Sequence, residues 1–135
     1  MRLVTLRGEQ LEDIEERLEA YDRQFSGEGP EGCIWLGLEE DGRLIAGLDA
    51  GITVFRILYV STVFVDEAYR RQGLGTRLMR EMEARAAAMG VTMIRLDTFD
   101  WQGKAFYEAL GYEIVGQYEN PAEGYAEYFF LKRLG

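Results

Sequence analysis

The stretch from Val60 to Thr76 constrains the fold most, because its hydrophobic pattern changes period at a loop that contains glycine. Up to Val65 the β-branched and aromatic residues favour a buried strand, whereas from Leu74 the apolar positions recur every three or four residues, as in a helix. The first N–H groups of a helix lack intrahelical acceptors, and the helix dipole adds partial positive charge there. The loop therefore predicts an anion site, and a phosphate-bearing ligand is the first hypothesis.

The loop alone does not identify that ligand. Gly73 and Gly75 leave room for a phosphate to approach the amides, while Arg70 and Arg71 supply countercharge. A glycine pair at a helix start can equally be a packing device. Two common motifs are rejected, because no Gly-Lys-Ser/Thr of a Walker loop follows and Leu78 does not supply the third glycine of a dinucleotide fingerprint. Neither ATP hydrolysis nor NAD binding is favoured.

Composition narrows the class of protein. The length of 135 residues predicts a single domain, and the net charge of −9 argues against nonspecific binding to nucleic acid or anionic membranes. The absence of an apolar run of membrane length or a secretion signal, and a single cysteine, predict a cytoplasmic protein. The chain has no histidine, which excludes histidine-based triads and zinc sites, and we expect no metal. Cys33 is expected to be a small buried residue.

The remaining pattern predicts one sheet with mixed strand directions. The unit from residue 57 to residue 98 reads as strand, helix and strand, which favours one parallel pair. We expect helices over residues 9–25, 74–89 and 102–110, and strands over residues 33–38, 44–52, 57–65, 91–98, 112–118 and 125–131, with residues 1–7 as a candidate edge strand. The first helix is amphipathic, so it should pack on something.

Two motifs resemble the signatures of the GNAT family of N-acetyltransferases. Val63-x-Val65, followed by Arg70-x-x-Gly73-x-Gly75, is similar to the acetyl-CoA signature, and the segment 106–112 (FYEALGY) resembles the second signature, FYxxxGY. The resemblance covers residues 34–131. It implies a three-layer α/β (α+β) fold with a mixed, mostly antiparallel sheet of six or seven strands and helices on both faces. It also implies acetyl-CoA-dependent transfer to a primary amine of a small molecule or peptide, by direct attack in a ternary complex.

The resemblance assigns roles to individual residues. The pyrophosphate would lie on the amides of Arg71, Gln72, Gly73, Leu74, Gly75 and Thr76, next to Arg70. The pantetheine arm would run along Val63 and Val65 as an added strand, which requires the strands ending near residues 65 and 98 to splay apart. Tyr107 would protonate or hydrogen-bond the leaving thiolate. The asparagine usual in the family seven residues before this tyrosine is Asp100 here.

The sequence does not identify the acceptor amine or the general base. The general base could be Asp97, Glu127, or a water chain that involves Tyr59 or Ser61. We expect the acceptor between the first helix, the loop 26–32 and the final hairpin. Six aromatic residues either line that pocket or belong to the core: Tyr21, Phe25, Trp35, Trp101, Tyr118 and Tyr125. The alternative function is a non-catalytic acyl-CoA-binding or regulatory module, and a homodimer is compatible with either.

Overall fold

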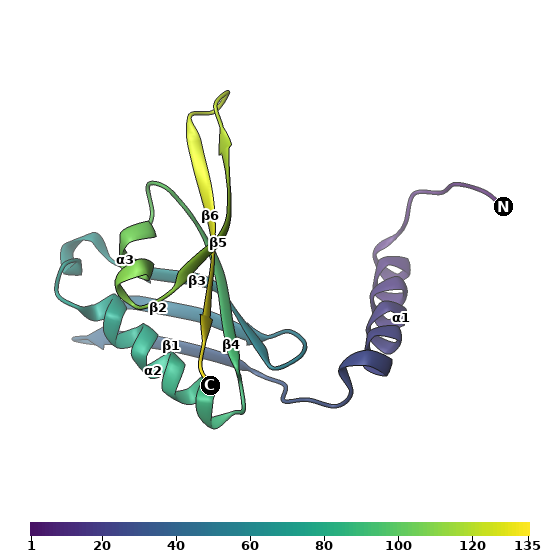
Figure 1. Cartoon of the computed structure of the whole chain (residues 1–135), viewed down its shortest axis with the longest axis horizontal. Helices are drawn as coiled ribbons and strands as arrows, with labels where there is room; N and C mark the ends of the chain where they lie inside the picture. The colour runs from purple at the N-terminus through teal and green to yellow at the C-terminus, as the bar shows by residue number, and fades with distance from the viewer.

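The computed structural model describes residues 1–135, which form a twisted six-stranded sheet, two helices packed against it and a third helix on an extended arm (Figure 1). In chain order the elements are α1 (Gly8–Ser26), β1 (Cys33–Glu40), β2 (Arg43–Ile52), β3 (Ile57–Val65), the 3-10 turn η1 (Glu67–Tyr69), α2 (Leu74–Ala88), β4 (Met93–Phe99), α3 (Lys104–Ala109), β5 (Glu113–Asn120) and β6 (Tyr125–Arg133). None of these helices combines the length and the apolar character needed to cross a bilayer.

The sheet has the strand order β1-β2-β3-β4-β6-β5, and only β3 and β4 are parallel. All six predicted strands form, and the predicted fold class with its single parallel strand–helix–strand unit is confirmed. Residues 1–7, the candidate edge strand, are extended but pair with no strand. One edge of β1 is therefore unpaired.

The core lies between the sheet and α2. Apolar residues of α2 recur at helical spacing, as the sequence predicts, and Met79, Met82 and Ala86 are completely buried against Leu58 and Ile94 of the two parallel strands. Gly90, at φ +87°, follows the end of α2 in a left-handed conformation that suits glycine. This packing fixes α2 under β3, so the loop between them has a defined position.

A buried polar network joins α2 to the C-terminal half of the sheet. Glu83 of α2 accepts hydrogen bonds from the Tyr112 hydroxyl (2.9 Å) and from Lys132 Nζ (3.0 Å), and Lys132 also donates to the Leu110 carbonyl (2.8 Å). Burial, together with the charge of Glu83, raises the pKa of Tyr112. The hydroxyl therefore stays protonated and remains a donor.

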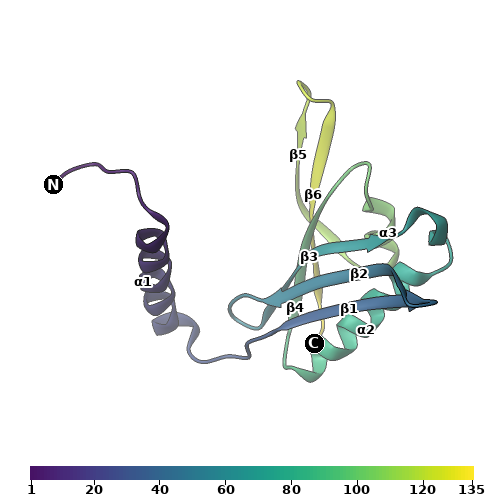
Figure 2. The same ribbon diagram turned by 180° about the vertical axis from the view of Figure 1, so that it is seen from behind.

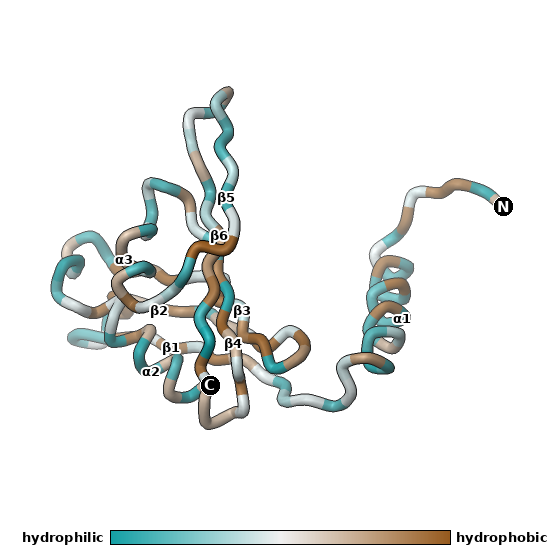
Figure 3. The backbone as a smooth tube through the Cα atoms, viewed as in Figure 1, coloured by the Kyte–Doolittle hydropathy of each residue, from teal (hydrophilic) through white to brown (hydrophobic).

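The helices do not cover both faces of the sheet, which corrects one detail of the expected architecture. Both α2 and α3 contribute to the core on the same face, and Figure 3 shows the apolar strands beneath them. α1 contains no buried residue and stands away from the sheet in both views (Figures 1 and 2). The other face, which we call the open face, carries Trp35, Gly47, Asp49, Tyr59 and Phe64, and within a single chain no helix covers it.

Candidate active site

The loop between β3 and α2 presents an uninterrupted row of free backbone donors. The six N–H groups of residues 71–76 donate to no acceptor in the chain, and the first helical hydrogen bond runs from the Arg77 N–H to the Gly73 carbonyl (3.0 Å). A helix start by itself leaves only about four such donors. The loop adds donors to those of the helix, so this segment suits a group with several negatively charged oxygens.

The two loop glycines have different roles. Gly73 is left-handed, at φ +80°, and a Cβ there would meet nothing within 4 Å, so its surroundings are open to a ligand. A Cβ at Gly75 would instead lie 3.1 Å from the ring of Phe106. Gly75 therefore lets α3 pack against the start of α2. The packing interpretation is correct for Gly75, and the ligand interpretation remains available for Gly73.

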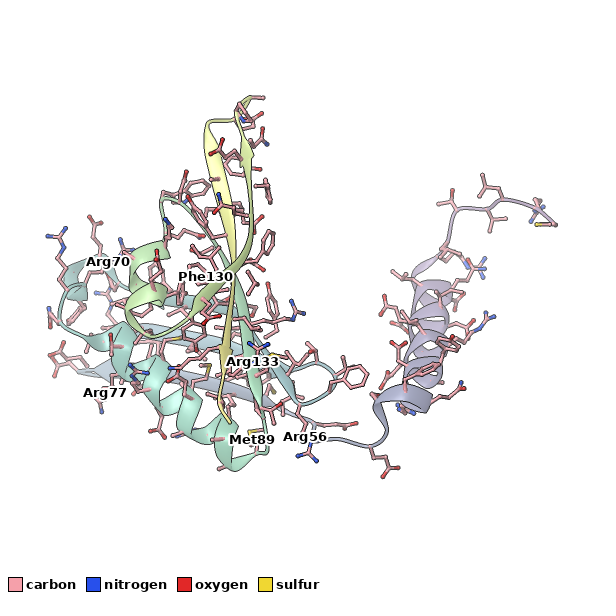
Figure 4. The ribbon with its side chains drawn as sticks, in the orientation of Figure 1. Arg56, Arg70, Arg77, Met89, Phe130 and Arg133 are labelled. Carbon is pink, nitrogen blue, oxygen red and sulfur yellow. The ribbon has the colours of Figure 1, made fainter.

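Arg70 braces this loop as well as adding charge to it. Its Nε donates to the Val65 carbonyl (2.9 Å), and its guanidinium lies 5.7 Å from the centre of the Phe64 ring. Figure 4 shows Arg70 and Arg77 at the end of the molecule far from α1, where the loop leads into α2. The side chain thus holds the end of β3 in place, and the site is positively charged.

The parallel strands β3 and β4 part at the level of this loop. Their pairing ends at Val60 and Leu96, although β3 continues to Val65 and β4 to Phe99. Along a strand, backbone groups of successive residues point to opposite edges. Because the Asp66 N–H donates to Ile45 of β2 (2.8 Å), the N–H groups of Val63 and Val65 point to the opposite edge, into the gap. The expected splay is present.

Tyr107 lies on α3 beside this gap. Its ring packs against Phe106, Tyr112 and Phe130, with ring centres 5.0, 6.1 and 5.8 Å away, while its hydroxyl has no hydrogen-bond partner in the chain. Burial and, second, the negative charge of Asp97 raise the pKa of Tyr107 to about 12. The phenol therefore stays protonated at neutral pH, with its donor free for a ligand.

Comparison with known proteins decides the family. The model of the acetyltransferase (GNAT) family matches residues 2–112. A blasticidin-S acetyltransferase of Streptomyces morookaense is 32% identical over 96 residues, which cover 70% of each chain. This chain belongs to the GNAT family of acetyltransferases.

Solved structures agree with this assignment. A crystal structure of an acetyltransferase from Bacillus cereus superposes with a TM-score of 0.91 at 26% identity, covering 98% of this chain and 97% of that one. An acetyltransferase of Bacillus anthracis, solved in complex with acetyl coenzyme A, shares the fold with a TM-score of 0.67 at 18% identity, over 82% of this chain and 66% of that one. Both GNAT signatures read from the sequence thus lie within the shared fold.

The open face beside the gap carries three carboxylates, each paired with a hydroxyl. Asp97, the first residue of β4 beyond the last β3 pair, accepts from the Tyr59 hydroxyl (3.0 Å). Glu127 on β6 accepts from Tyr118, and Asp49 on β2 accepts from Ser61 (3.0 Å). Burial, the hydrogen bond to Asp97 and a contribution from the charge of Glu127 raise the pKa of Tyr59. The four residues expected as base or water-chain candidates therefore all lie on this face.

One expectation about an individual residue is wrong, and one departure from the family motif has a structural role. Cys33 is exposed at the start of β1, so the prediction that it is buried is wrong. Asp100, which replaces the usual asparagine, accepts a hydrogen bond from the Ala126 N–H (3.0 Å), and the Asp100 N–H donates to the Ala126 carbonyl (3.0 Å). Its side chain therefore ties the segment before α3 to β6.

The expected acceptor pocket is not assembled within one chain. Trp101, Tyr118 and Tyr125 gather toward the turn end of the β5–β6 hairpin, where Trp101 stacks on Phe99 with ring centres 4.7 Å apart. Tyr21 and Phe25 lie on α1, which stands apart from this cluster (Figure 1). The sequence predicted that the first helix packs on something, but no pattern indicated that the helix would leave its own sheet.

Two residues of the site, Asp49 and Arg95, were not predicted from the sequence. Asp49 interrupts an otherwise apolar strand, and that interruption was the available signal for its place on the open face. The guanidinium of Arg95 lies 4.4 Å from the centre of the Tyr59 ring, which holds the Tyr59–Asp97 pair in position. Gly103 leaves room for Tyr107, because a Cβ there would lie 3.1 Å from the ring of Tyr107.

Proposed function

We propose that this protein transfers the acetyl group of acetyl-CoA to a primary amine of a small molecule or peptide, by direct attack within a ternary complex. The observation that carries the proposal is the row of free amides at residues 71–76 next to a gap in the sheet. The amides suit a pyrophosphate, and the N–H groups of Val63 and Val65 suit the amide-rich pantetheine arm. Acetyl-CoA supplies an acetyl group already activated as a thioester.

The amine would approach from the open face, opposite Tyr107. The three carboxylates on that face favour a cationic acceptor, and the name of the Streptomyces relative, a blasticidin-S acetyltransferase, supports an amine on a small molecule. Asp97 takes the proton that the amine must lose, and the Tyr59 hydroxyl orients that carboxylate. The new bond joins the amine nitrogen to the carbonyl carbon, and the carbon–sulfur bond breaks.

Two donors of this chain would stabilise the charge that develops. The Val65 N–H, which points into the gap, polarises the thioester carbonyl, and the Tyr107 hydroxyl donates to the departing thiolate. Since the pKa of Tyr107 is about 12 and that of a thiol is about 8.5, hydrogen bonding is favoured over complete proton transfer. Positioning of the amine and the thioester supplies the rest of the rate enhancement.

The substitution Tyr107→Phe tests the proposal, because it removes the hydroxyl and keeps the ring packing. We expect kcat to fall by roughly 10²–10³-fold, the usual cost of removing a hydrogen-bond donor to a developing negative charge. The affinity for acetyl-CoA, measured by calorimetry, should stay unchanged. Release of free thiol with a panel of amines provides the assay and identifies the acceptor.

The same measurements separate the enzyme from a non-catalytic acyl-CoA-binding module. Binding of acetyl-CoA without thiol release for any amine would favour the module. A wild-type rate in Tyr107→Phe, under conditions in which chemistry limits turnover, would contradict the role given to Tyr107. Asp97→Asn is the matching test on the open face, and it should lower kcat while leaving acetyl-CoA affinity intact.

A further inference from the structure

The apolar side of α1 has no partner in its own chain. Five residues at helical spacing form this stripe, and their exposed fractions lie between 46% and 67%: Leu11, Ile14, Leu18, Tyr21 and Phe25. Ion pairs such as Arg17–Asp13 (3.4 Å) and Arg23–Glu19 (2.8 Å) join polar residues one turn apart on the helix. Most of the stability of a helix in a protein comes from packing of its apolar side, so the stripe requires a surface to cover it.

The open face of the sheet offers such a surface. Gly47 has no side chain, and between Leu44 and Phe64 it leaves an apolar groove of about 470 Å³. Leu44 is 63% exposed, Phe64 is 57% exposed and Trp35, one row further along β1, is 73% exposed. Large apolar side chains in such numbers on one face indicate an interaction site.

The arm keeps α1 away from this face in the same chain. The linker between α1 and β1 leads past the loop at residues 53–56, and a cleft of about 750 Å³ separates that loop from the C-terminal half of α1. Figure 2 shows the arm leaving the N-terminal end of β1 and carrying α1 away from the sheet. Residues 1–7 also have no partner in the chain, and the outer edge of β1 has no neighbouring strand. An unpaired strand edge can pair with a segment of another chain.

The arm is part of the domain and is extended in a relative. The family model already matches from residue 2. Residues 1–32 make up about a quarter of the chain, so a TM-score of 0.91 requires the arm of the Bacillus cereus protein to be extended in the same way. An extended arm with an apolar helix at its end, on a body with an uncovered apolar face, is suited to reciprocal exchange.

We propose that two copies of this chain exchange their arms, so that α1 of each copy packs on the open face of the other. The partner's helix then covers Phe64 and the groove at Gly47, and its residues form one wall of the acceptor site near Asp97. The assignment of that wall rests on the proposed function, whereas the exchange itself does not. The complete acceptor site therefore belongs to a dimer.

Charged residues in the stripe test the exchange without reference to activity. In sedimentation equilibrium the wild-type chain should have twice its 15.5 kDa mass, and Ile14→Asp with Leu18→Asp should be a monomer. The control Glu12→Gln with Glu16→Gln changes the opposite side of α1 and should stay dimeric. A monomeric wild-type protein, or a dimeric stripe variant, would overturn the proposal.

Filling the groove tests the receiving surface. A Cβ at Gly47 would meet only the Leu36 carbonyl oxygen, 3.7 Å away, so Gly47→Leu is compatible with the fold. We expect this variant to weaken dimerisation at least tenfold while its circular dichroism spectrum stays that of the wild type. An unchanged dissociation constant would exclude the groove as the docking site.

Mixing two defective chains tests the shared acceptor site. The stripe variant keeps Tyr107 but has a defective arm, whereas the Tyr107→Phe chain keeps a normal arm. Titrating the Tyr107→Phe chain into a fixed amount of the stripe variant should raise thiol release to a plateau well above either chain alone. Mixed dimers without this recovery would overturn the shared site. Full activity of Tyr107→Phe by itself would instead count against the role of Tyr107, and the sedimentation result would stand.

Discussion

The two sides of the gap between β3 and β4 are built in different ways. On the proposed cofactor side, the free amides of residues 71–76 and Tyr107 come from two short segments, the start of α2 and α3, which the core holds together. On the open face, Asp49, Asp97 and Glu127 come from three different strands, and no helix of the chain covers them. One chain builds the first side, whereas the carboxylates of the second side lie uncovered within that chain.

The largest expected effect is on acetyl-CoA affinity, and it should leave the open face unchanged. Gly73→Val places a β-branched residue in a left-handed conformation and fills the space in front of the amides, so acetyl-CoA affinity should fall at least ~100-fold, corresponding to about 3 kcal/mol. Calorimetry measures the loss, and the dimer should persist.

The matched control for that variant is Gly42→Val. Gly42 has nearly the same φ (+78°) and equally free space, but it lies in the turn between β1 and β2. The control therefore carries the same backbone strain and should keep its acetyl-CoA affinity. Equal loss in the two variants would attribute the effect to strain rather than to the site.

Lys132→Met tests whether the cofactor side depends on the core beneath it. The substitution removes a partner of the buried Glu83 carboxylate and should lower the free energy of unfolding by about 3 kcal/mol. Urea denaturation measures this change, with Lys104→Met as a less buried control whose ion pair to Glu108 spans 3.9 Å. A loss no larger than that of the control would mean that Arg80 and Tyr112 are sufficient for Glu83.

Gly103→Ala tests how precisely the Tyr107 hydroxyl must be placed. The new Cβ would lie 3.1 Å from the ring of Tyr107, so the hydroxyl must shift, and we expect kcat to fall about tenfold. Acetyl-CoA affinity should change little, because the amides of residues 71–76 are untouched. Addition of the same substitution to Tyr107→Phe should cost much less, and a full tenfold loss there would show that Gly103 acts independently of the hydroxyl.

The smallest expected effect concerns the pH profile of kcat, in which ionisation of Tyr107 should cause no change below pH 10. Because the pKa of Tyr107 is about 12, against an ordinary value of 10.0, the hydroxyl remains a donor throughout the range from pH 6 to 10. The kcat profile should therefore show no descending limb from Tyr107 below pH 10. A descending limb in that range that disappears in Tyr107→Phe would contradict the raised pKa.

The same shift has a consequence for stability at high pH. The folded pKa lies above the unfolded one, so burial of the neutral phenol contributes its stability fully below pH 10. This contribution is lost as the pH rises from 10 toward 12, since the unfolded chain ionises first. Tyr107→Phe should flatten this part of the stability profile, as measured by denaturant unfolding at each pH.

Sequence predicts the helix and strands of the proposed cofactor side well because local patterns determine them. The change of period near Leu74 correctly predicts the strand, the loop and the helix, whereas the role that the family motif gives to Tyr107 stays a prediction. The open face depends instead on register, since Asp97 meets Tyr59 only because pairing of β3 with β4 ends at Val60 and Leu96. The amphipathic pattern of α1 shows that the helix needs a partner, but periodicity carries no information on which chain supplies it.

The contact between Gly75 and Phe106 limits how such a sequence can change over generations. The ring of Phe106 occupies the volume in which a side chain at position 75 would begin, at 3.1 Å. A larger residue at position 75 would push α3 outward and move the neighbouring Tyr107 with it. A smaller residue at position 106 would make room for that side chain. The loop at residues 71–76 and α3 are therefore constrained to change together, although α2 and β4 lie between them in the chain.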